Sequence, residues 1–212
     1  LQYIAPETFR NCEQLKTFYI GKAFRGKINY GEEGDPDTLF LYYAPIRLIQ
    51  IDKENTSYQL QNEILYTRDG HILCQALKND NADSQLTIPS CVTEIADGAF
   101  YRNSEFGAIE VKGSLERIGI SAFACADVGS FYVKGGVNYL DRGSFYQSAI
   151  SEWRCHGGVK KYEKSAFQDV DATNGYAIDM NAITKLYQEL LYVNATTDLS
   201  YWVKTIWNWI IM

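Results

Sequence analysis

The stretch ERIGISAFAC, residues 116 to 125, decides the fold because its Ala-Phe pair returns along the chain in similar surroundings. The upstream stretch TEIADGAFYRN and the downstream stretches NYLDRGSFYQS and KYEKSAFQD each place a small residue before a phenylalanine. These phenylalanines are Phe100, Phe123, Phe145 and Phe167, which follow one another at steps of 23, 22 and 22 residues. A nearly fixed step of this size predicts a solenoid in which each repeat forms one coil.

A second pattern accompanies the phenylalanines, with apolar residues at positions 1, 4 and 6 of a six-residue segment. Positions 4 and 6 are two apart, so in a strand both side chains point to one face, toward the core. The segments are LKTFYI (15 to 20), IRLIQI (46 to 51), FGAIEV (106 to 111), VGSFYV (128 to 133) and ISEWRC (150 to 155). The Ala-Phe pair then lies across the coil on a short helical turn, and its ring fills the core.

Glycines mark the places where each coil turns. Gly113, Gly135 and Gly157 follow the predicted strands, and glycine permits the sharp turns needed there. A further apolar pair follows them in each repeat, which we interpret as a short extended piece. The pattern thus predicts an α/β solenoid with one short parallel strand and one short helical turn per repeat. The apolar pairs are Val92 with Ile95, Leu115 with Ile118, Val137 with Leu140, and Val159 with Tyr162.

The repeated residues resemble a known family. The stretches LTIPSCVTEIADGAFYRN (86 to 103), LQYIAPETFRNCEQLKTFYI (1 to 20) and LERIGISAFAC (115 to 125) are similar to BspA-like leucine-rich repeats. The insert IQIDKENTSYQLQNEILYTRDGHILCQAL (49 to 77) resembles an insertion that recurs in that family. The resemblance implies a leucine-rich repeat coil, and it implies a bacterial protein, secreted or exposed at the cell surface, that takes part in adhesion to host or matrix proteins.

The chain is expected to have two parts. Residues 1–175 form the repeat solenoid, with a hairpin insert at about 52–85 in which Asp69-Gly70 favours a two-residue type I′ turn. Residues 176–212 place apolar side chains at helical spacing, which predicts a helical hairpin that caps the last coil. Tryptophan is frequent at interfaces, so a partner-binding role for these Trp-rich helices is the alternative.

Charge and hydropathy narrow the class of partner. Lys and Arg total 20 while Asp and Glu total 26, a net charge of −6, which argues against nucleic acid and anionic membranes as main partners. The apolar stretch YWVKTIWNWIIM is short and contains Lys204, so no membrane insertion by this chain is expected. The chain begins at Leu1, inside a repeat, which suggests a piece of a longer protein.

The sequence offers no catalytic or metal-binding set. The five cysteines lack a CxxC pair, which disfavours zinc and predicts buried thiols. The acidic loop 29–37 could hold calcium, but it does not follow an EF-hand pattern. Cys155 and His156 are neighbours on a strand and therefore face opposite sides, so they cannot form a nucleophile and its base. Because no hydrolase or nucleotide-binding motif occurs either, we predict no cofactor, no metal and no enzymatic activity.

Stacking the coils generates a surface from the residues that alternate with the inward positions. Their side chains form rows about 4.8 Å apart on a firm sheet, which suits recognition of a protein or glycan. An ordinary polar sheet face is the alternative. The candidate binding residues are Tyr19, Gln50, Glu110, Tyr132 and Arg154, and beside them Asp52, Lys112, Lys134 and His156.

These observations predict a non-catalytic binding or adhesion domain of a bacterial cell-surface or secreted protein, located outside the cell. The expected partner is a host or matrix protein, or a glycan, and the domain is expected to be a monomer. One alternative is a structural spacer or scaffold domain of a larger surface protein, with the Trp-rich C-terminal helices as its partner contact. A regulatory module attached to an enzyme is a further alternative.

Overall fold

The computed structural model describes a β-solenoid. The residues described are 8–9, 12, 14–26, 28, 46–77, 84–103 and 106–167. Within them the chain forms thirteen strands and no helix, so no helix there could span a bilayer. The strands are β1 (Thr17–Ile20), β2 (Leu48–Ile51), β3 (Tyr58–Gln61), β4 (Ile64–Thr67), β5 (Ile72–Ala76), β6 (Ser84–Ile88), β7 (Glu94–Ile95), β8 (Phe106–Val111), β9 (Leu115–Ile118), β10 (Asp127–Val133), β11 (Val137–Leu140), β12 (Ala149–Cys155) and β13 (Val159–Tyr162).

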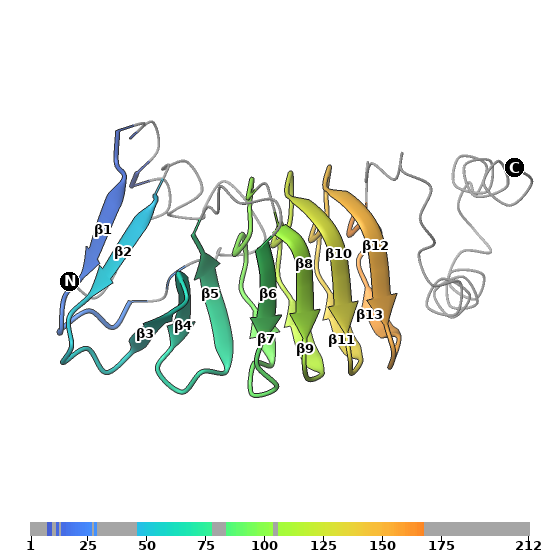
Figure 1. Ribbon diagram of the computed structural model, residues 1–212, viewed down its shortest axis with the longest axis horizontal. Coiled ribbons are helices and arrows are strands. Elements are labelled where there is room, and N and C mark those ends of the chain that lie inside the picture. Colours follow the sequence, from blue (N-terminus) through green and yellow to red (C-terminus); the bar gives the residue numbers. More distant parts are fainter. Residues whose placement is uncertain are drawn as a thin grey trace, which may run out of the picture.

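The regular part of the solenoid consists of four coils, each with two strands. The first strands of the coils pair in parallel in the order β12-β10-β8-β6, and the second strands in the order β13-β11-β9-β7. The two sheets lie on opposite sides of the coil stack (Figure 1). We predicted one strand per repeat, and this was wrong. The apolar pairs that we interpreted as short extended pieces form a second parallel sheet.

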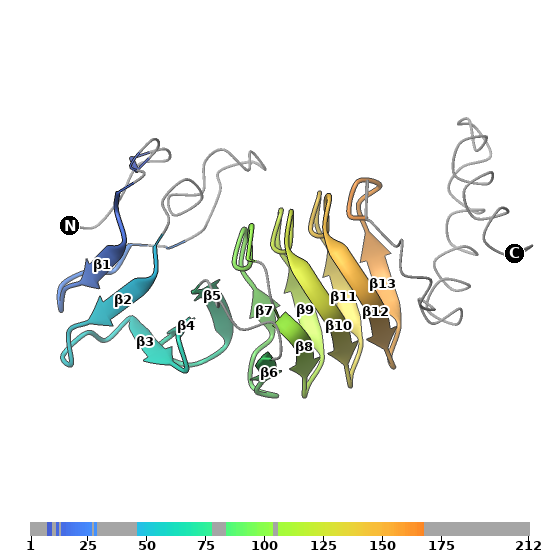
Figure 2. The same ribbon diagram turned by 45° about the horizontal axis from the view of Figure 1, so that its top comes forward.

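The N-terminal part of the described chain departs from this regular stack. Strands β3, β4 and β5 pair as an antiparallel meander, and β5 joins β7 in parallel, so the meander extends the second sheet. Strands β1 and β2 form a separate two-stranded parallel sheet. Figure 2 shows β1 and β2 at the N-terminal end, with β3, β4 and β5 between them and the regular coils. The first coil strand of the regular part, β6, has a sequence that our six-residue pattern did not recognise.

A column of phenylalanine rings fills the core, as predicted. Phe100, Phe123, Phe145 and Phe167 stack with ring centroids 4.6, 5.0 and 5.2 Å apart and planes inclined by 10°, 2° and 6°. The first three rings are fully buried. Inward residues of the first sheet meet these rings edge-on. For example, the Phe131 ring centroid lies 5.0 Å from that of Phe123, and the two ring planes are inclined by 74°. The rings of neighbouring coils therefore touch one another as well as the sheet.

The Ala-Phe segments are turns and not helices, which corrects the predicted α/β class. Alternate amides of each segment donate to the next coil instead of to their own chain four residues back. The amide of Phe123 donates to the carbonyl of Ser144 (2.7 Å), while the amide of Ala124 donates back only to Ser121 (3.1 Å). A helix would need both of these donors within one segment. The coil stack thus replaces helical hydrogen bonds with bonds between repeats.

The corner glycines lie where no larger residue fits. A Cβ atom on Gly135 would lie 2.8 Å from the carbonyl oxygen of Gly113 in the preceding coil. The amide of Gly135 donates to that same oxygen (3.0 Å), and Gly157 donates to Gly135 in turn (2.9 Å). The backbones of successive corners therefore stack directly on one another, which is the reason for glycine at this repeat position.

The insert contains antiparallel hairpins, and its two-residue turn lies at Asn62-Glu63 instead of the predicted Asp69-Gly70. Asn62 and Glu63 both have positive φ (49° and 63°) between the paired residues Gln61 and Ile64, as a type I′ turn requires. At the predicted site Asp69-Gly70, only the glycine has positive φ (76°). The Asp69 carboxylate accepts from the Thr67 hydroxyl and the His71 amide, which favours a longer loop. The loop 29–37 and the predicted cap at 176–212 lie outside the described residues.

Candidate functional site

The outer face of the sheet β6-β8-β10-β12 brings most of the predicted surface residues together. Tyr132 is in register with Glu110 on one side and with Arg154 on the other, so these three form a row across the strands. The Lys134 amide donates a hydrogen bond to the Val111 carbonyl and the His156 amide donates one to the Val133 carbonyl, which keeps the following positions in the same register. A second row therefore runs beside the first and consists of Lys112, Lys134 and His156.

The charged groups of these rows pair locally. Glu110 contacts the ammonium groups of Lys112 and of Lys134, the latter at 3.3 Å. The hydrogen bond from Lys112, then that from Lys134, lowers the pKa of the Glu110 carboxyl against the opposing effect of burial. Arg154 forms an ion pair with Glu152 on its own strand, and the guanidinium side chain is still 60% exposed. Among the described residues, Glu152 is the acidic side chain that pairs with Arg154.

A hollow of about 210 Å³ lies at the β12 end of these rows. The Tyr132 ring meets the His156 ring edge-on at 5.1 Å and 85°, and its hydroxyl lies 3.0 Å from His156 Nε2. The Phe131 side chain is buried, so this residue offers only backbone to the hollow. The hollow is lined by Ser130, Phe131, Tyr132, Glu152, Arg154 and His156.

Tyr19 and Gln50 belong to a different sheet. They are in register with each other on β1 and β2, and neither strand pairs with the four-stranded sheet. The Tyr19 hydroxyl donates to Asp52 Oδ2 (3.0 Å), and this bond raises the pKa of the tyrosine. Tyr19 is 59% exposed. The insert separates these two residues from the main row because it adds strands to the second sheet only.

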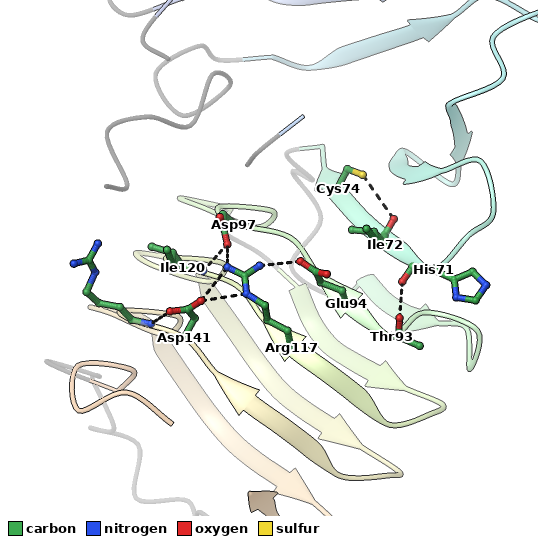
Figure 3. A network of polar contacts seen from close by, with 10 residues as sticks. His71, Ile72, Cys74, Thr93, Glu94, Asp97, Arg117, Ile120 and Asp141 are labelled. Carbon is green, nitrogen blue, oxygen red and sulfur yellow. Dashed lines mark hydrogen bonds and ion pairs between the residues drawn. The ribbon is translucent and has the colours of Figure 1, made fainter. Parts of the chain in front are cut away.

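The opposite sheet carries a polar network that our sequence analysis did not predict. Arg117 on β9 contacts three carboxylates, one from β7 and two from the turns that follow β7 and β11 (Figure 3). Its Nη1 donates to Glu94 Oε1 (2.8 Å), its Nη2 contacts Asp97, and its Nε donates to Asp141 Oδ2 (3.1 Å). The repeated outward position between each apolar pair, which holds Glu94 and Arg117 at a spacing of 23 residues, was the available signal.

The Arg117 network is partly buried and structural. The Asp97 side chain is 3% exposed, and its Oδ1 also accepts from the Ile120 amide (2.8 Å). Burial alone lowers the pKa of Arg117, but the charge of Asp97 and hydrogen bonds to Asp97 and Asp141 outweigh it and raise that pKa. The side chain of Asp97 passes close to Gly119, where a Cβ atom would lie 2.6 Å from the Asp97 amide nitrogen.

Tyr139 lies beside Arg117 on this second face. It is in register with Arg117 and with Lys161. Its hydroxyl donates to Glu163 Oε1 (2.7 Å), and the Lys161 ammonium lies 5.0 Å from its ring centroid. Burial and then this hydrogen bond raise the pKa of Tyr139. Arg117 and Tyr139 on this face are therefore paired with neighbouring side chains, whereas Arg154 and His156 on the first face are exposed beside a hollow.

The cysteines do not form a reactive or metal-binding group in the described residues. No disulfide joins the five cysteines; Cys74 and Cys155 are buried as predicted, whereas Cys12 and Cys125 are only partly buried and Cys91 is exposed. Cys155 donates its S–H to the Gly158 carbonyl (3.3 Å) and lies inside while His156 lies outside, so the two do not meet. Burial raises the pKa of the Cys155 thiol. No group of three or more His, Cys, Asp or Glu residues in this part of the chain could hold a metal ion.

Both the fold and the sequence of this solenoid were compared with those of known proteins. The crystal structure of the pneumococcal vaccine antigen PcpA is similar, with a TM-score of 0.57 and 16% sequence identity. The match covers 89% of this chain and 57% of that chain, so this chain spans little more than half of the PcpA structure, and the likeness concerns the fold. No curated protein matches the sequence. A family model, the BspA type leucine rich repeat region with 6 copies, matches residues 70–174. Through this region the chain belongs to the BspA-type leucine-rich repeat family.

Proposed function

We propose that this chain is a non-catalytic recognition domain of a bacterial surface or secreted protein. In this proposal the ligand binds to the outer face of the sheet β6-β8-β10-β12. The main observation in its support is that the two sheets differ in how far their outward arginines are exposed and paired. Arg117 on one sheet is 24% exposed and surrounded by three carboxylates, while Arg154 on the other is 60% exposed and lines a hollow.

The geometry of the face supports recognition. Parallel pairing fixes Glu110, Tyr132 and Arg154 in one row. The inward residues of the same strands are buried in the core and hold the strands in place. The sheet already holds the backbone of these residues, so binding a ligand needs to order only their side chains. Tyrosine and arginine are also the residue types that contribute most often to binding energy.

The surface location rests on family membership and on the fold. The resemblance implies secreted or surface-exposed proteins, and the pneumococcal protein of similar fold is a vaccine antigen. The ligand is then a molecule found outside the bacterial cell, a host or matrix protein or a glycan. The alternative is a spacer that positions other domains and whose sheet face binds nothing.

The proposal is tested by probing arrays of matrix proteins and glycans with the purified chain. A variant with Tyr132→Ala and Arg154→Ala is probed in parallel. The matched control is Tyr139→Ala with Lys161→Ala, because these residues form the corresponding tyrosine and cation pair, in register, on the opposite sheet. We expect the first variant to lose at least about 10-fold in affinity, while the control binds like the wild type.

Thermal unfolding separates lost binding from lost folding. Arg154 is exposed and Tyr132 is half-exposed, so the first variant should melt close to the wild type. A chain that binds nothing on the arrays would favour the spacer alternative. Binding that survives in the Tyr132 and Arg154 variant but fails in the control would move the recognition surface to the other sheet.

A further inference from the structure

We infer that the hollow beside Tyr132 is a subsite for one sugar ring that carries an anionic group, either a carboxylate or a sulfate ester. This inference rests on the proposed function and names the class of ligand for the same surface. Four properties of the hollow support it: its size, the aromatic ring of Tyr132 at its side, the hydrogen-bonding groups around it and the charge of the two rows.

The size and floor of the hollow fit a single ring. Its volume of about 210 Å³ lies below the roughly 300 to 1,000 Å³ of pockets that enclose drug-sized ligands. Ser130 forms part of the lining and is in register with the small Ala108 on one side and with Glu152 on the other. The larger Tyr132 stands in the next row. The hollow is therefore a shallow depression over the small residue Ser130, and the aromatic ring of Tyr132 forms its side.

The lining alternates donors and acceptors over a short distance. Glu152 offers carboxylate oxygens, Arg154 offers N–H groups beyond its one contact with Glu152, and Ser130 offers a hydroxyl that can both donate and accept. A sugar ring presents neighbouring hydroxyl groups that need both kinds of partner, and its C–H face can pack against the Tyr132 ring. One apolar wall and several polar groups therefore match a saccharide.

Of the two proposed ligand classes, the same face favours a glycan over a protein. Protein interfaces have an apolar centre with buried anchors. The large exposed hydrophobic residues in the described chain are Tyr19, Leu48 and Leu60. They belong to β1, β2 and β3, and none of these strands lies in the four-stranded sheet. The sheet that carries the hollow thus lacks exposed aliphatic anchors.

The charge of the face favours an anion. In the two rows and the hollow, Lys112, Lys134 and Arg154 supply three positive charges and Glu110 and Glu152 two negative charges, a local balance of 3 − 2 = +1, with His156 counted as neutral. Asp127, exposed at the other end of β10, belongs to neither row and is not counted. The whole chain carries −6. A positive patch on an acidic protein concentrates anions at that place, and a guanidinium matches the geometry of a carboxylate or sulfate. The anionic substituent would therefore lie beside Arg154.

The experiment is a titration of the purified chain, followed by NMR or calorimetry, with four small probes. These are glucose, glucuronic acid, glucose 6-sulfate and inorganic sulfate. We expect the two acidic sugars to bind at least about 10-fold more tightly than glucose, and inorganic sulfate to bind at least about 10-fold more weakly than glucose 6-sulfate. The ratio of the two acidic sugars distinguishes the carboxylate from the sulfate as the preferred group.

Three variants locate the site. Arg154→Gln should reduce the affinity for the acidic sugars to that for glucose, and Tyr132→Ala should abolish binding of all three sugars. Lys161→Gln, which removes a cation from the opposite sheet, should bind like the wild type. Equal affinity for glucose and the acidic sugars, or sulfate binding as tight as that of glucose 6-sulfate, would overturn the inference.

The failure of this inference is distinguishable from that of the proposed function. If the arrays yield a protein ligand that depends on Tyr132 and Arg154 while no sugar binds, the sheet face remains a recognition surface and the saccharide subsite is wrong. If sugars bind but the Tyr132→Ala variant binds them equally well, the subsite lies elsewhere. If neither sugars nor array ligands bind, both proposals fail.

Discussion

The rings of Phe123 and Phe145 lie parallel, with centroids 5.0 Å apart and planes inclined by 2°. This separation is close to the distance between neighbouring strands, about 4.8 Å, because the same translation relates each ring and each strand to the next coil. Each ring is therefore held by the coils before and after it. The position of one repeat along the stack depends on contacts with its neighbours.

Removing a central ring should be more costly than removing the last one. Phe123 is fully buried between two rings, so Phe123→Ala should lower the free energy of unfolding by about 3 to 5 kcal/mol. Phe167 is only partly buried, so Phe167→Ala should cost clearly less. Denaturant unfolding of both variants measures the difference. Equal losses would mean that the column does not distinguish interior from terminal coils.

A methyl group on Gly119 should disturb the second sheet. Its Cβ atom would lie 2.6 Å from the Asp97 amide nitrogen, and the flanking residues Ala96 and Gly98 donate backbone hydrogen bonds to neighbouring coils. We expect Gly119→Ala to cost about 1 to 3 kcal/mol, as overpacking does in other cores. Gly21→Ala is the matched control, because its Cβ would make an ordinary 3.8 Å contact with Tyr19. A Gly119 variant as stable as this control would show that the turn can move.

Removing Arg117 should leave a buried carboxylate without its partner. Arg117→Met is expected to lower stability by about 3 to 5 kcal/mol, since breaking a buried ion pair from one side strands the other charge. Arg154→Met removes an exposed guanidinium and should cost no more than about 1 kcal/mol. Adding Asp97→Asn to Arg117→Met should recover part of the loss, because the stranded charge is gone. Additive losses in this double-mutant cycle would argue against direct coupling.

Alkaline pH should destabilise the chain through two buried groups. Burial raises the pKa of Tyr66 from 10.0 to about 12 and that of Cys74 from 9.0 to about 12. The unfolded chain loses these protons first, so stability is full below about pH 9 and falls as pH rises toward 12. Tyr66→Phe should reduce the loss above about pH 10, and Cys74→Ala should reduce the part that begins near pH 9. A pH series of denaturant unfolding curves measures this, and unchanged slopes in both variants would contradict it.

The sequence alone predicted the parts of the fold that depend on short-range periodicity. The step from Phe100 to Phe123 and onward predicted coils, and alternation within segments such as FGAIEV predicted which side chains face the core. Both follow from local geometry, because side chains two apart in a strand point the same way. The row of Glu110, Tyr132 and Arg154 followed from the same rule once the coils were stacked.

The tertiary structure decided what depends on contacts between coils. The turn around Phe123 could have been helical by its own residues, but bonding to the next coil made it an open turn. The hollow beside Glu152 and the meeting of Arg117 with Asp97 and Asp141 also join residues from different repeats. These interactions form only after stacking brings together side chains from successive repeats. Local patterns therefore determined the shape of one coil, and the packing of coils determined which polar groups became structural and which remained open to a ligand.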